Sequence, residues 1–386
     1  MSLLVPGAAA APPDPGQAPP PSQPQHERRG PTPAGMVARI SVLVAVFMIV
    51  VFLPTNLPDL LSFATQGAIF AVVGLSLNVI IGYTGQLSLG HNGFVGIGAF
   101  TAAYAATVQG VPFALTFLLA GVVTALFALA IGLVALRITG LYLSLITLVF
   151  GLTLESTLFE VPSLTNSGAG QPADLPERFL LDPKQYYWLC LAIVAVAVYF
   201  DWRLLRSKVG RALLALKENE RVAEAFGVNV TGYKLLAFTF SGMLAGVAGA
   251  MFAYFSGSVV GNNFGFSTFL FLTFVLMVVV GGAGSRVGVI VGSAFFGVLD
   301  YLLEETPIHY LIDGAFGAFG EAGVAAEQFA PQFLGALLLI LTLIFNPGGI
   351  AQQLRPLTSW LSGKPFSLHG HDDAGPGAVE GSSVRA

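Results

Sequence analysis

The stretch from Gly82 to Gly98, GYTGQLSLGHNGFVGIG, holds the side chains best suited to contact a polar solute. They are Gln86, Ser88, His91 and Asn92, and Asn78 lies one turn earlier. The six glycines of the stretch weaken a regular helix. At membrane depth, irregular backbone is tolerated only against protein or a water-filled cavity. One interpretation is a broken or re-entrant element that lines a substrate path. The other is a tight turn between two spans, with its polar groups in headgroup water. Spacing alone does not choose between them.

His91 also raises the hypothesis of a proton carrier or general base, because ionisable residues inside a membrane are commonly functional. No carboxylate lies near it in sequence to orient the ring, which disfavours this reading. The single Cys190 lies in an apolar run, so no disulfide and no cysteine-based metal site is expected. We expect neither a cofactor nor a metal ion.

A second candidate is the charged stretch ALKENERVAEAFGVN, residues 215–229. Good helix formers run from Ala215 to Phe226, and Gly227 can supply the left-handed residue that ends a helix. The stretch predicts a short amphipathic helix whose narrow apolar face is made by Leu216, Ala223 and Phe226. Such a helix lies on a bilayer or docks in a groove of a soluble partner. The mixed charges and the small apolar face favour docking to a protein.

Composition describes the elements that must position these residues. Of 386 residues, 55% are hydrophobic and 10% are charged, against about 25% charged in soluble domains. The apolar residues form solid blocks long enough to cross about 30 Å of hydrocarbon as helices, and they lack the alternation of barrel strands. We predict an all-α polytopic membrane protein with about ten transmembrane helices, at 37–53, 60–81, 90–108, 113–136, 140–159, 186–200, 234–256, 264–283, 287–303 and 330–346.

The basic residues predict the orientation of these spans. With the amino terminus in the cytoplasm, 15 Lys and Arg fall in cytoplasmic segments, and only Arg178 and Lys184 fall outside. This is the bias of the positive-inside rule. We therefore expect a multi-pass protein of the cytoplasmic (inner) membrane with both termini in the cytoplasm.

Three regions follow from this pattern. Residues 1–36 contain ten of the 23 prolines and predict a disordered cytoplasmic tail. Residues 37–350 form the transmembrane domain, in which 201–233 is the longest cytoplasmic loop. Residues 351–386 are expected to be a second disordered cytoplasmic tail. Within the domain, Gly242 and Gly246, and likewise Gly284, Gly288 and Gly292, recur every four residues, which is typical of close helix packing in lipid.

Two long motifs in order give a resemblance to a known family. The strings GYTGQLSLGHNGFVGIGAF (82–100) and ALKENERVAEAFGVNVTGYKLLAFTFSGMLAGVAGAMFA (215–253) resemble the LivM-like subunit of branched-chain amino-acid ABC-importer permeases. VLMVVVGGAGSRVGVIVG (275–292) and IFNPGGI (344–350) fit as well, and the resemblance covers roughly 40–350.

The resemblance implies an importer with a sister permease subunit, two cytoplasmic ABC ATPases and an extracytoplasmic substrate-binding protein. It also implies that a short cytoplasmic helix couples the permease to the ATPase. The matching residues are Glu218, Asn219, Glu220, Ala223, Glu224 and Gly227.

The chain itself is expected to be a transport subunit and not an enzyme. It has no G-x-x-x-x-G-K-[S/T] sequence, so an ATP-driven mechanism places hydrolysis on another polypeptide. No nucleic-acid partner is expected.

Urea and short-chain amide permeases have similar signatures, so the substrate class stays open. An ion-coupled transporter would want a charged residue at mid-membrane, and none stands out. A membrane enzyme using His91 lacks a visible partner.

Overall fold

The structure is a computed structural model that describes residues 33–135, 140–162, 164–167, 169–177, 179, 182–260, 268–304, 337, 340–341, 344 and 349–361. The chain divides into two compact units, Met1–Ala45 and Val46–Ala386.

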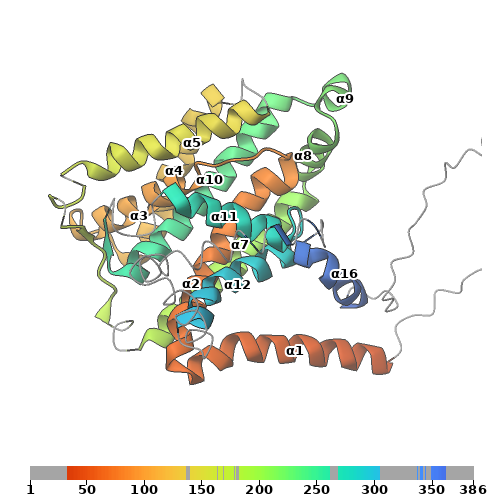
Figure 1. The fold of residues 1–386 in the computed structure, drawn as a ribbon, viewed down its shortest axis with the longest axis horizontal. Coiled ribbons are helices and arrows are strands. Elements are labelled where there is room, and N and C mark those ends of the chain that lie inside the picture. The colour runs from red at the N-terminus through yellow and green to blue at the C-terminus, as the bar shows by residue number, and fades with distance from the viewer. Residues whose placement is uncertain are drawn as a thin grey trace, which may run out of the picture. The chain divides into compact units, whose positions relative to one another are not determined.

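The described residues are almost all helical, as predicted (Figure 1). The helices are α1 (Pro33–Asn56), α2 (Pro58–Leu77), α3 (His91–Thr107), α4 (Phe113–Ala135), α5 (Leu141–Ser156), α7 (Pro183–Arg206), α8 (Lys208–Glu218), α9 (Glu220–Ala225), α10 (Val230–Ser256), α11 (Thr268–Gly281), α12 (Arg286–Glu304) and α16 (Gly349–Leu361). A π-helix, η1 (Asn78–Gly82), extends α2, and a 3₁₀ turn, η2 (Leu158–Glu160), follows α5. Two short antiparallel strands, β1 (Gln171–Pro172) and β2 (Ser258–Val259), pair with each other.

Local sequence explains several helix ends. Pro58 and Pro183 occupy the first turns of α2 and α7, where a missing N–H costs nothing. The Asp182 carboxylate accepts a hydrogen bond from the Lys184 backbone N–H and caps α7. Gly257 ends α10 in the left-handed conformation, with φ of 73°, which glycine adopts without steric cost.

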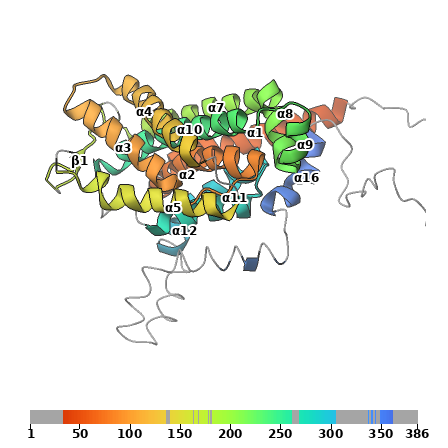
Figure 2. The ribbon, with the colours of Figure 1, turned by 90° about the horizontal axis from the view of Figure 1, so that it is seen from above.

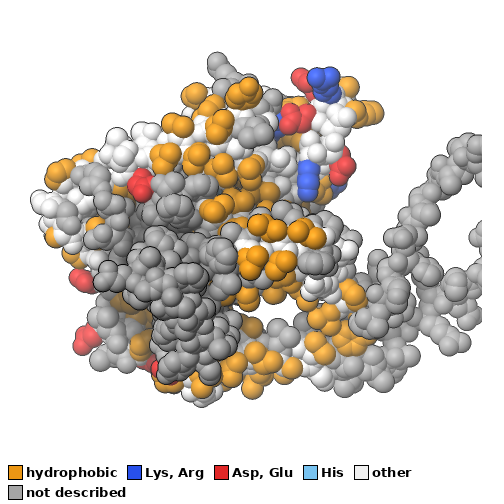
Figure 3. Space-filling model, viewed as in Figure 1, with side chains coloured by type: hydrophobic (Ala, Val, Ile, Leu, Met, Phe, Trp, Pro, Cys, Tyr) orange, Lys and Arg blue, Asp and Glu red, His pale blue; other side chains and the backbone are white. Residues whose placement is uncertain are grey.

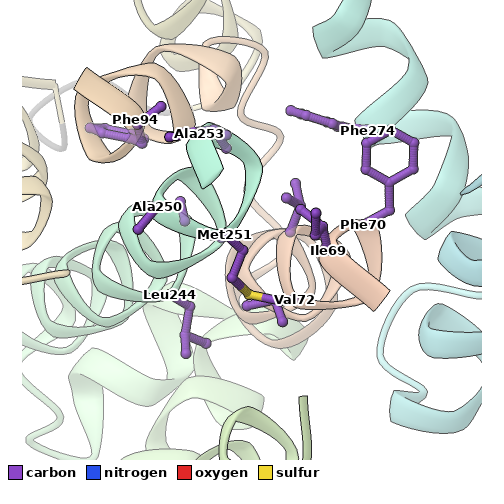
Figure 4. Close-up of a cluster of buried hydrophobic side chains, with 14 of the residues drawn as sticks. Ile69, Phe70, Val72, Phe94, Leu244, Ala250, Met251, Ala253 and Phe274 are labelled. Carbon is purple, nitrogen blue, oxygen red and sulfur yellow. The ribbon is translucent and has the colours of Figure 1, made fainter. Parts of the chain in front are cut away.

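The core lies around α2 and α10, which pack against each other; α10 also packs against α3 and α4, and α2 against α7 and α12. Figure 4 shows Ile69, Phe70 and Val72 of α2 near Leu244 and Met251 of α10, together with side chains of α3 and α11. In the apolar window of the α2–η1 helix, 83% of residues are buried within the protein. This helix is therefore the central one of the described bundle.

Small residues let the helix backbones approach closely, as their spacing predicts. A Cβ at Gly246 would lie 2.5 Å from the Ala120 carbonyl oxygen, and one at Gly292 would lie 2.7 Å from Gly281 Cα. No side chain fits at these distances. The helix-packing interpretation of the four-residue glycine spacing is confirmed at these positions.

Four described helices are long and apolar enough to cross a membrane: Pro58–Gly82, Phe113–Val134, Pro183–Arg206 and Val230–Ser256. Shorter apolar helices cover Tyr142–Ser156, Leu272–Gly281 and Arg286–Gly297. Helices coincide with the predicted spans from 37–53 through 287–303, whereas 330–346 lies almost entirely outside the described residues. The count of about ten spans stays a prediction.

Helix α7 continues to Arg206 and α10 begins at Val230, so both ends of the predicted cytoplasmic loop 201–233 are helical, and its bounds stay a prediction. Residues 351–361 belong to α16 and are not an irregular tail. The reason is local packing, because Ala351 of α16 lies against Gly288, where the missing side chain leaves room for it. Residues 33–36 of the first predicted tail belong to α1, and the rest of the two predicted tails, 1–32 and 362–386, lies outside the described residues.

Candidate functional site

The segment between α7 and α10 forms two helices instead of the single helix predicted over Ala215–Phe226. Helix α8 ends at Glu218 and α9 begins at Glu220. Asn219 between them is extended, with φ of −161° and ψ of 109°, and its side-chain oxygen accepts hydrogen bonds from the N–H groups of Arg221 and Val222. Asparagine is a favoured N-cap residue, so it starts a new helix here. Gly227 is left-handed beyond α9, with φ of 82°, as predicted.

The α8–α9 segment (208–227) lies at one end of the unit, together with α16, and β1 lies at the other end (Figures 1 and 2). On the face drawn in Figure 3, the visible basic side chains gather over α8 and α9, and hydrophobic side chains dominate the area beside them. The segment is therefore the charged end of an apolar bundle.

A buried ion pair fixes α9 to α10. Lys234 of α10 donates a hydrogen bond to Glu220 Oε1 at 2.5 Å, and the Lys234 side chain is only 2% exposed, whereas that of Glu220 is 40% exposed. A buried ammonium needs such a partner, because it has lost its hydration. Glu220 therefore holds the start of α9 to the first turns of α10.

The apolar face of the segment is only partly as predicted. Leu216 and Ala223 are buried in a cluster with Val79 and Tyr83, which follow α2. Phe226, predicted to share this face, is instead 85% exposed. Leu216 and Ala223 share a face across the break at Asn219, whereas Phe226 is the C-cap of α9, where the helix ends, so the helical spacing from Ala223 does not extend to it.

Six residues were predicted to couple the permease to a partner, and the structure divides them. Glu218, Glu224 and Gly227 are exposed. Asn219 is exposed too, but its side chain caps α9, while Glu220 and Ala223 are turned toward the bundle. Val222, 50% exposed, and Phe226 form the apolar part of the free surface of α9 and its C-cap. Phe226 was part of the predicted apolar face and Val222 was not, because exposure in a six-residue helix depends on how the helix is seated.

The glycine-rich stretch is a broken element. After η1 the backbone is irregular from Gly85 to Gly90, and α3 begins at His91. Side chains of α5 satisfy this backbone, since Ser144 Oγ donates to the Leu87 carbonyl at 2.8 Å and Leu89 N–H donates to Thr147 Oγ1 at 3.1 Å. These two backbone groups of the irregular stretch are thus bonded to protein; the choice between a path-lining element and a turn at the headgroups stays a prediction.

The polar side chains of this stretch differ in burial and in their partners. Ser88, His91 and Asn92 are buried, Gln86 is half-buried, and Asn78 is buried one turn from the end of η1. Asn78 Oδ1 accepts a hydrogen bond from Gly284 N–H, at 2.7 Å, in the turn between α11 and α12. Their predicted role in a translocation path stays a prediction.

His91 is held by serines of two other helices. Its Nε2 lies 2.7 Å from Ser76 Oγ, and Ser76 Oγ donates to the Ser241 carbonyl at 2.6 Å. Ser241 Oγ in turn donates to the Ser76 carbonyl at 2.7 Å. With the Ser76 proton on the Ser241 carbonyl, the ring donates from Nε2 to Ser76 Oγ, and the buried Nδ1 has no hydrogen-bond partner among the described residues. This network joins α2, α3 and α10.

A second buried network lies at the α8–α9 end. Tyr83 donates to Asp201 Oδ2 at 3.0 Å, and Arg286 forms an ion pair with the same carboxylate. Asp201 is fully buried. Burial raises the pKa of Tyr83 well above its usual range, and the Asp201 charge raises it further, so the phenol remains a donor. Sequence reasoning missed this network. Two charged residues next to apolar runs could have indicated it: Asp201 directly follows 186–200, and Arg286 directly precedes 287–303.

A cavity of about 580 Å³ opens beside this network, lined by residues of α8, the α11–α12 turn and α16. Lys217 and Arg286 are among its lining residues. Among the described residues, no group of three or more His, Cys, Asp or Glu is placed to hold a metal ion.

Comparison with known proteins identifies relatives over most of the chain. Residues 60–343 match the family described as branched-chain amino acid transport system / permease component. The high-affinity branched-chain amino acid transport system permease protein LivM of Salmonella typhimurium is 30% identical over 329 residues, which cover 78% of this chain and 72% of that protein. LivM of Escherichia coli is 29% identical over 321 residues, covering 76% and 70%.

Other permeases match over less of the chain. The nucleoside ABC transporter permease protein NupC of Lactococcus lactis is 29% identical over 154 residues, covering 40% of this chain and 45% of that protein. No solved structure matches.

Proposed function

The chain belongs to the family of branched-chain amino acid transport permease components, and we propose that it is one of two membrane subunits of an ATP-driven importer. The second would be a sister permease, and two cytoplasmic ABC ATPases would hydrolyse the ATP. An extracytoplasmic binding protein would deliver the solute. The α8–α9 segment and both termini would face the cytoplasm.

The proposed solutes are branched-chain or related amino acids. The LivM relatives, which cover most of the chain, carry that substrate in their names. The nucleoside permease matches less than half of the chain. A urea or short-chain amide solute would be the alternative.

The free surface of the α8–α9 segment is the observation that carries the proposal. Phe226 is 85% exposed and Val222 is 50% exposed at the charged end of the bundle, and the charged residues Glu218, Arg221 and Glu224 surround them. An apolar tip amid mixed charges suits a groove in a soluble partner better than an anionic bilayer, which attracts a basic face. ATP-driven closure of the ATPases would push this tip and switch the bundle between outward-open and inward-open states.

Phe226→Ala tests this role. We expect the purified permease complex to bind its ATPases about tenfold more weakly or worse, because a large side chain in a partner's pocket commonly contributes that much. Co-purification and titration of the ATPases measure the loss. Val196→Ala is the matched control, since Val196 is a similarly exposed apolar residue of α7, 53% exposed. Equal ATPase binding by both variants would contradict the proposal.

We further propose that the glycine-rich stretch borders the translocation path in another state of the cycle. In the described conformation Gln86 is half-buried and Ser88 and Asn92 are buried. With Cys190 replaced by Ala, a water-soluble thiol reagent should therefore label cysteine at 86 without nucleotide. Cysteines at 88 and 92 should react only after ATP binding. If all three positions stayed inert in both states, the path role would be excluded.

A further inference from the structure

Lys217 joins the α8–α9 segment to the central helix of the bundle. Its Nζ donates a hydrogen bond to the Gly82 carbonyl at 2.8 Å, across 135 positions of sequence. Gly82 is the last residue of η1. The Lys217 stem passes Gly85, where a Cβ would lie 3.4 Å from Lys217 Cγ. The lysine therefore touches both the end of the helix and the start of the irregular stretch 85–90.

The chemistry of a helix end explains why a cation sits here. The last carbonyl groups of a helix have no partner within the helix and carry partial negative charge. Lys217 supplies a cationic donor to one of them from another segment of the chain. Single-turn π-helices such as η1 are frequent at functional sites, and this one separates the buried α2 from the glycine-rich stretch.

The end of α2–η1 that accepts the Lys217 hydrogen bond is also bonded to residues of two other helical regions. Asn78 of η1 accepts a hydrogen bond from Gly284 in the α11–α12 turn. Tyr83, directly after η1, is bonded to Asp201 of α7, which pairs with Arg286 of α12. A displacement of Gly82 is thus shared by α7 and α12 as well as by α2.

We propose that Lys217 is a positioning residue that transmits movement of the α8–α9 segment to the end of α2–η1 and to the glycine-rich stretch. This inference rests on the proposed function, because it assumes that ATPases move the segment. The Glu220–Lys234 pair acts on a different element, since it holds α9 to α10. Lys217 instead links α8 to the stretch that begins at Gly85.

The test uses the full chain assembled with its sister permease and ATPases, in a Cys190→Ala background with the single reporter Ser88→Cys, a buried position of the glycine-rich stretch. The measured quantity is the ratio of thiol-labelling rates with and without ATP, which needs no knowledge of the solute. With Lys217 intact we expect a ratio of about fivefold or more, the lower range of allosteric coupling. Lys217→Met should bring the ratio to near one while the ATPases still bind. Lys217→Arg, which keeps a cationic donor, should recover most of it.

Arg211→Met is the matched control, because Arg211 is an exposed cation of the same helix. Within the described part of the chain, its guanidinium donates a hydrogen bond only to the nearby Arg206 carbonyl. This variant should leave the ratio unchanged. The inference is overturned if Lys217→Met keeps the parent ratio, if Arg211→Met loses it equally, or if ATP leaves the parent ratio at one although the ATPases bind. Failure of the parent complex to bind ATPases is a different result, which contradicts the proposed function itself.

Discussion

At the scale of single residues, the two partners of the Glu220–Lys234 pair are not equivalent. Lys234 is 2% exposed and Glu220 is 40% exposed. Removing the carboxylate leaves an ammonium without water or partner, whereas removing the ammonium leaves a carboxylate that solvent can reach. The unequal burial therefore predicts unequal effects of the two substitutions.

We expect Glu220→Ala to lower the free energy of unfolding by about 2–3 kcal/mol, less than a fully buried pair because Glu220 is partly exposed. Lys234→Met should cost about 1 kcal/mol or less, since methionine fits the buried site and Glu220 rehydrates. Thermal unfolding of the purified protein in detergent measures both. The double variant is the control and should resemble Lys234→Met. A larger loss from Lys234→Met than from Glu220→Ala would contradict the burial argument.

At the scale of elements, α5 supplies hydrogen-bond partners to the irregular part of the glycine-rich stretch. Thr147 accepts the hydrogen bond from Leu89 N–H, and Gly90 lies so close to α5 that a Cβ there would overlap the Thr147 carbonyl. The stretch keeps its shape because a neighbouring helix supplies partners to its backbone. The irregular residues 85–90 have no regular helical hydrogen bonds that could hold their backbone.

Thr147→Val should therefore destabilise the stretch locally. A buried N–H left without an acceptor costs about 1–3 kcal/mol, and the cysteine at 86 should become more reactive toward thiol reagents. Thr153→Val is the control on the same helix. Within the described residues, the exposed Thr153 hydroxyl donates only to the Val149 carbonyl of its own helix. The effect of this substitution should stay within about 0.5 kcal/mol. Identical behaviour of the two variants would show that α5 does not hold the stretch.

At the scale of the whole unit, the charged α8–α9 segment and the start of α7 lie at opposite ends of a helix long enough to span a bilayer. Helix α7 runs from Pro183 to Arg206, and α8 follows directly at Lys208. If α7 crosses the membrane once, Lys184 and Glu224 must face opposite sides.

Cysteine labelling in intact cells tests this arrangement, again with Cys190 replaced by Ala. A membrane-impermeant reagent should label Lys184→Cys directly and Glu224→Cys only after permeabilisation. Both residues are exposed, so access to the reagent depends on the membrane and not on the fold. Labelling of both positions from outside, or the reverse order, would contradict the predicted orientation.

Composition and pattern were sufficient to predict a helical membrane bundle, the positions of most helices and the chemical character of the 215–227 stretch, and the resemblance of two long motifs indicated the family. These features are local, because twenty apolar residues in a row or a glycine every fourth position act through the nearest turns of one helix. The same reasoning predicted one amphipathic helix and missed the start of α9, because the capping strength of Asn219 competes with helix propensity over only a few residues.

The partners of the polar groups were decided by tertiary structure. Lys217 and Gly82, Asp201 and Arg286, and His91 and Ser76 are distant in sequence, and each pair meets only because helices from different parts of the chain pack together. A buried charge or carbonyl needs a partner, but sequence does not say which one lies within reach. For the same reason Leu216, Ala223 and Phe226 were predicted on one apolar face, but the first two are buried in the bundle and only Phe226 is exposed, since the seating of a short helix depends on contacts with the rest of the bundle.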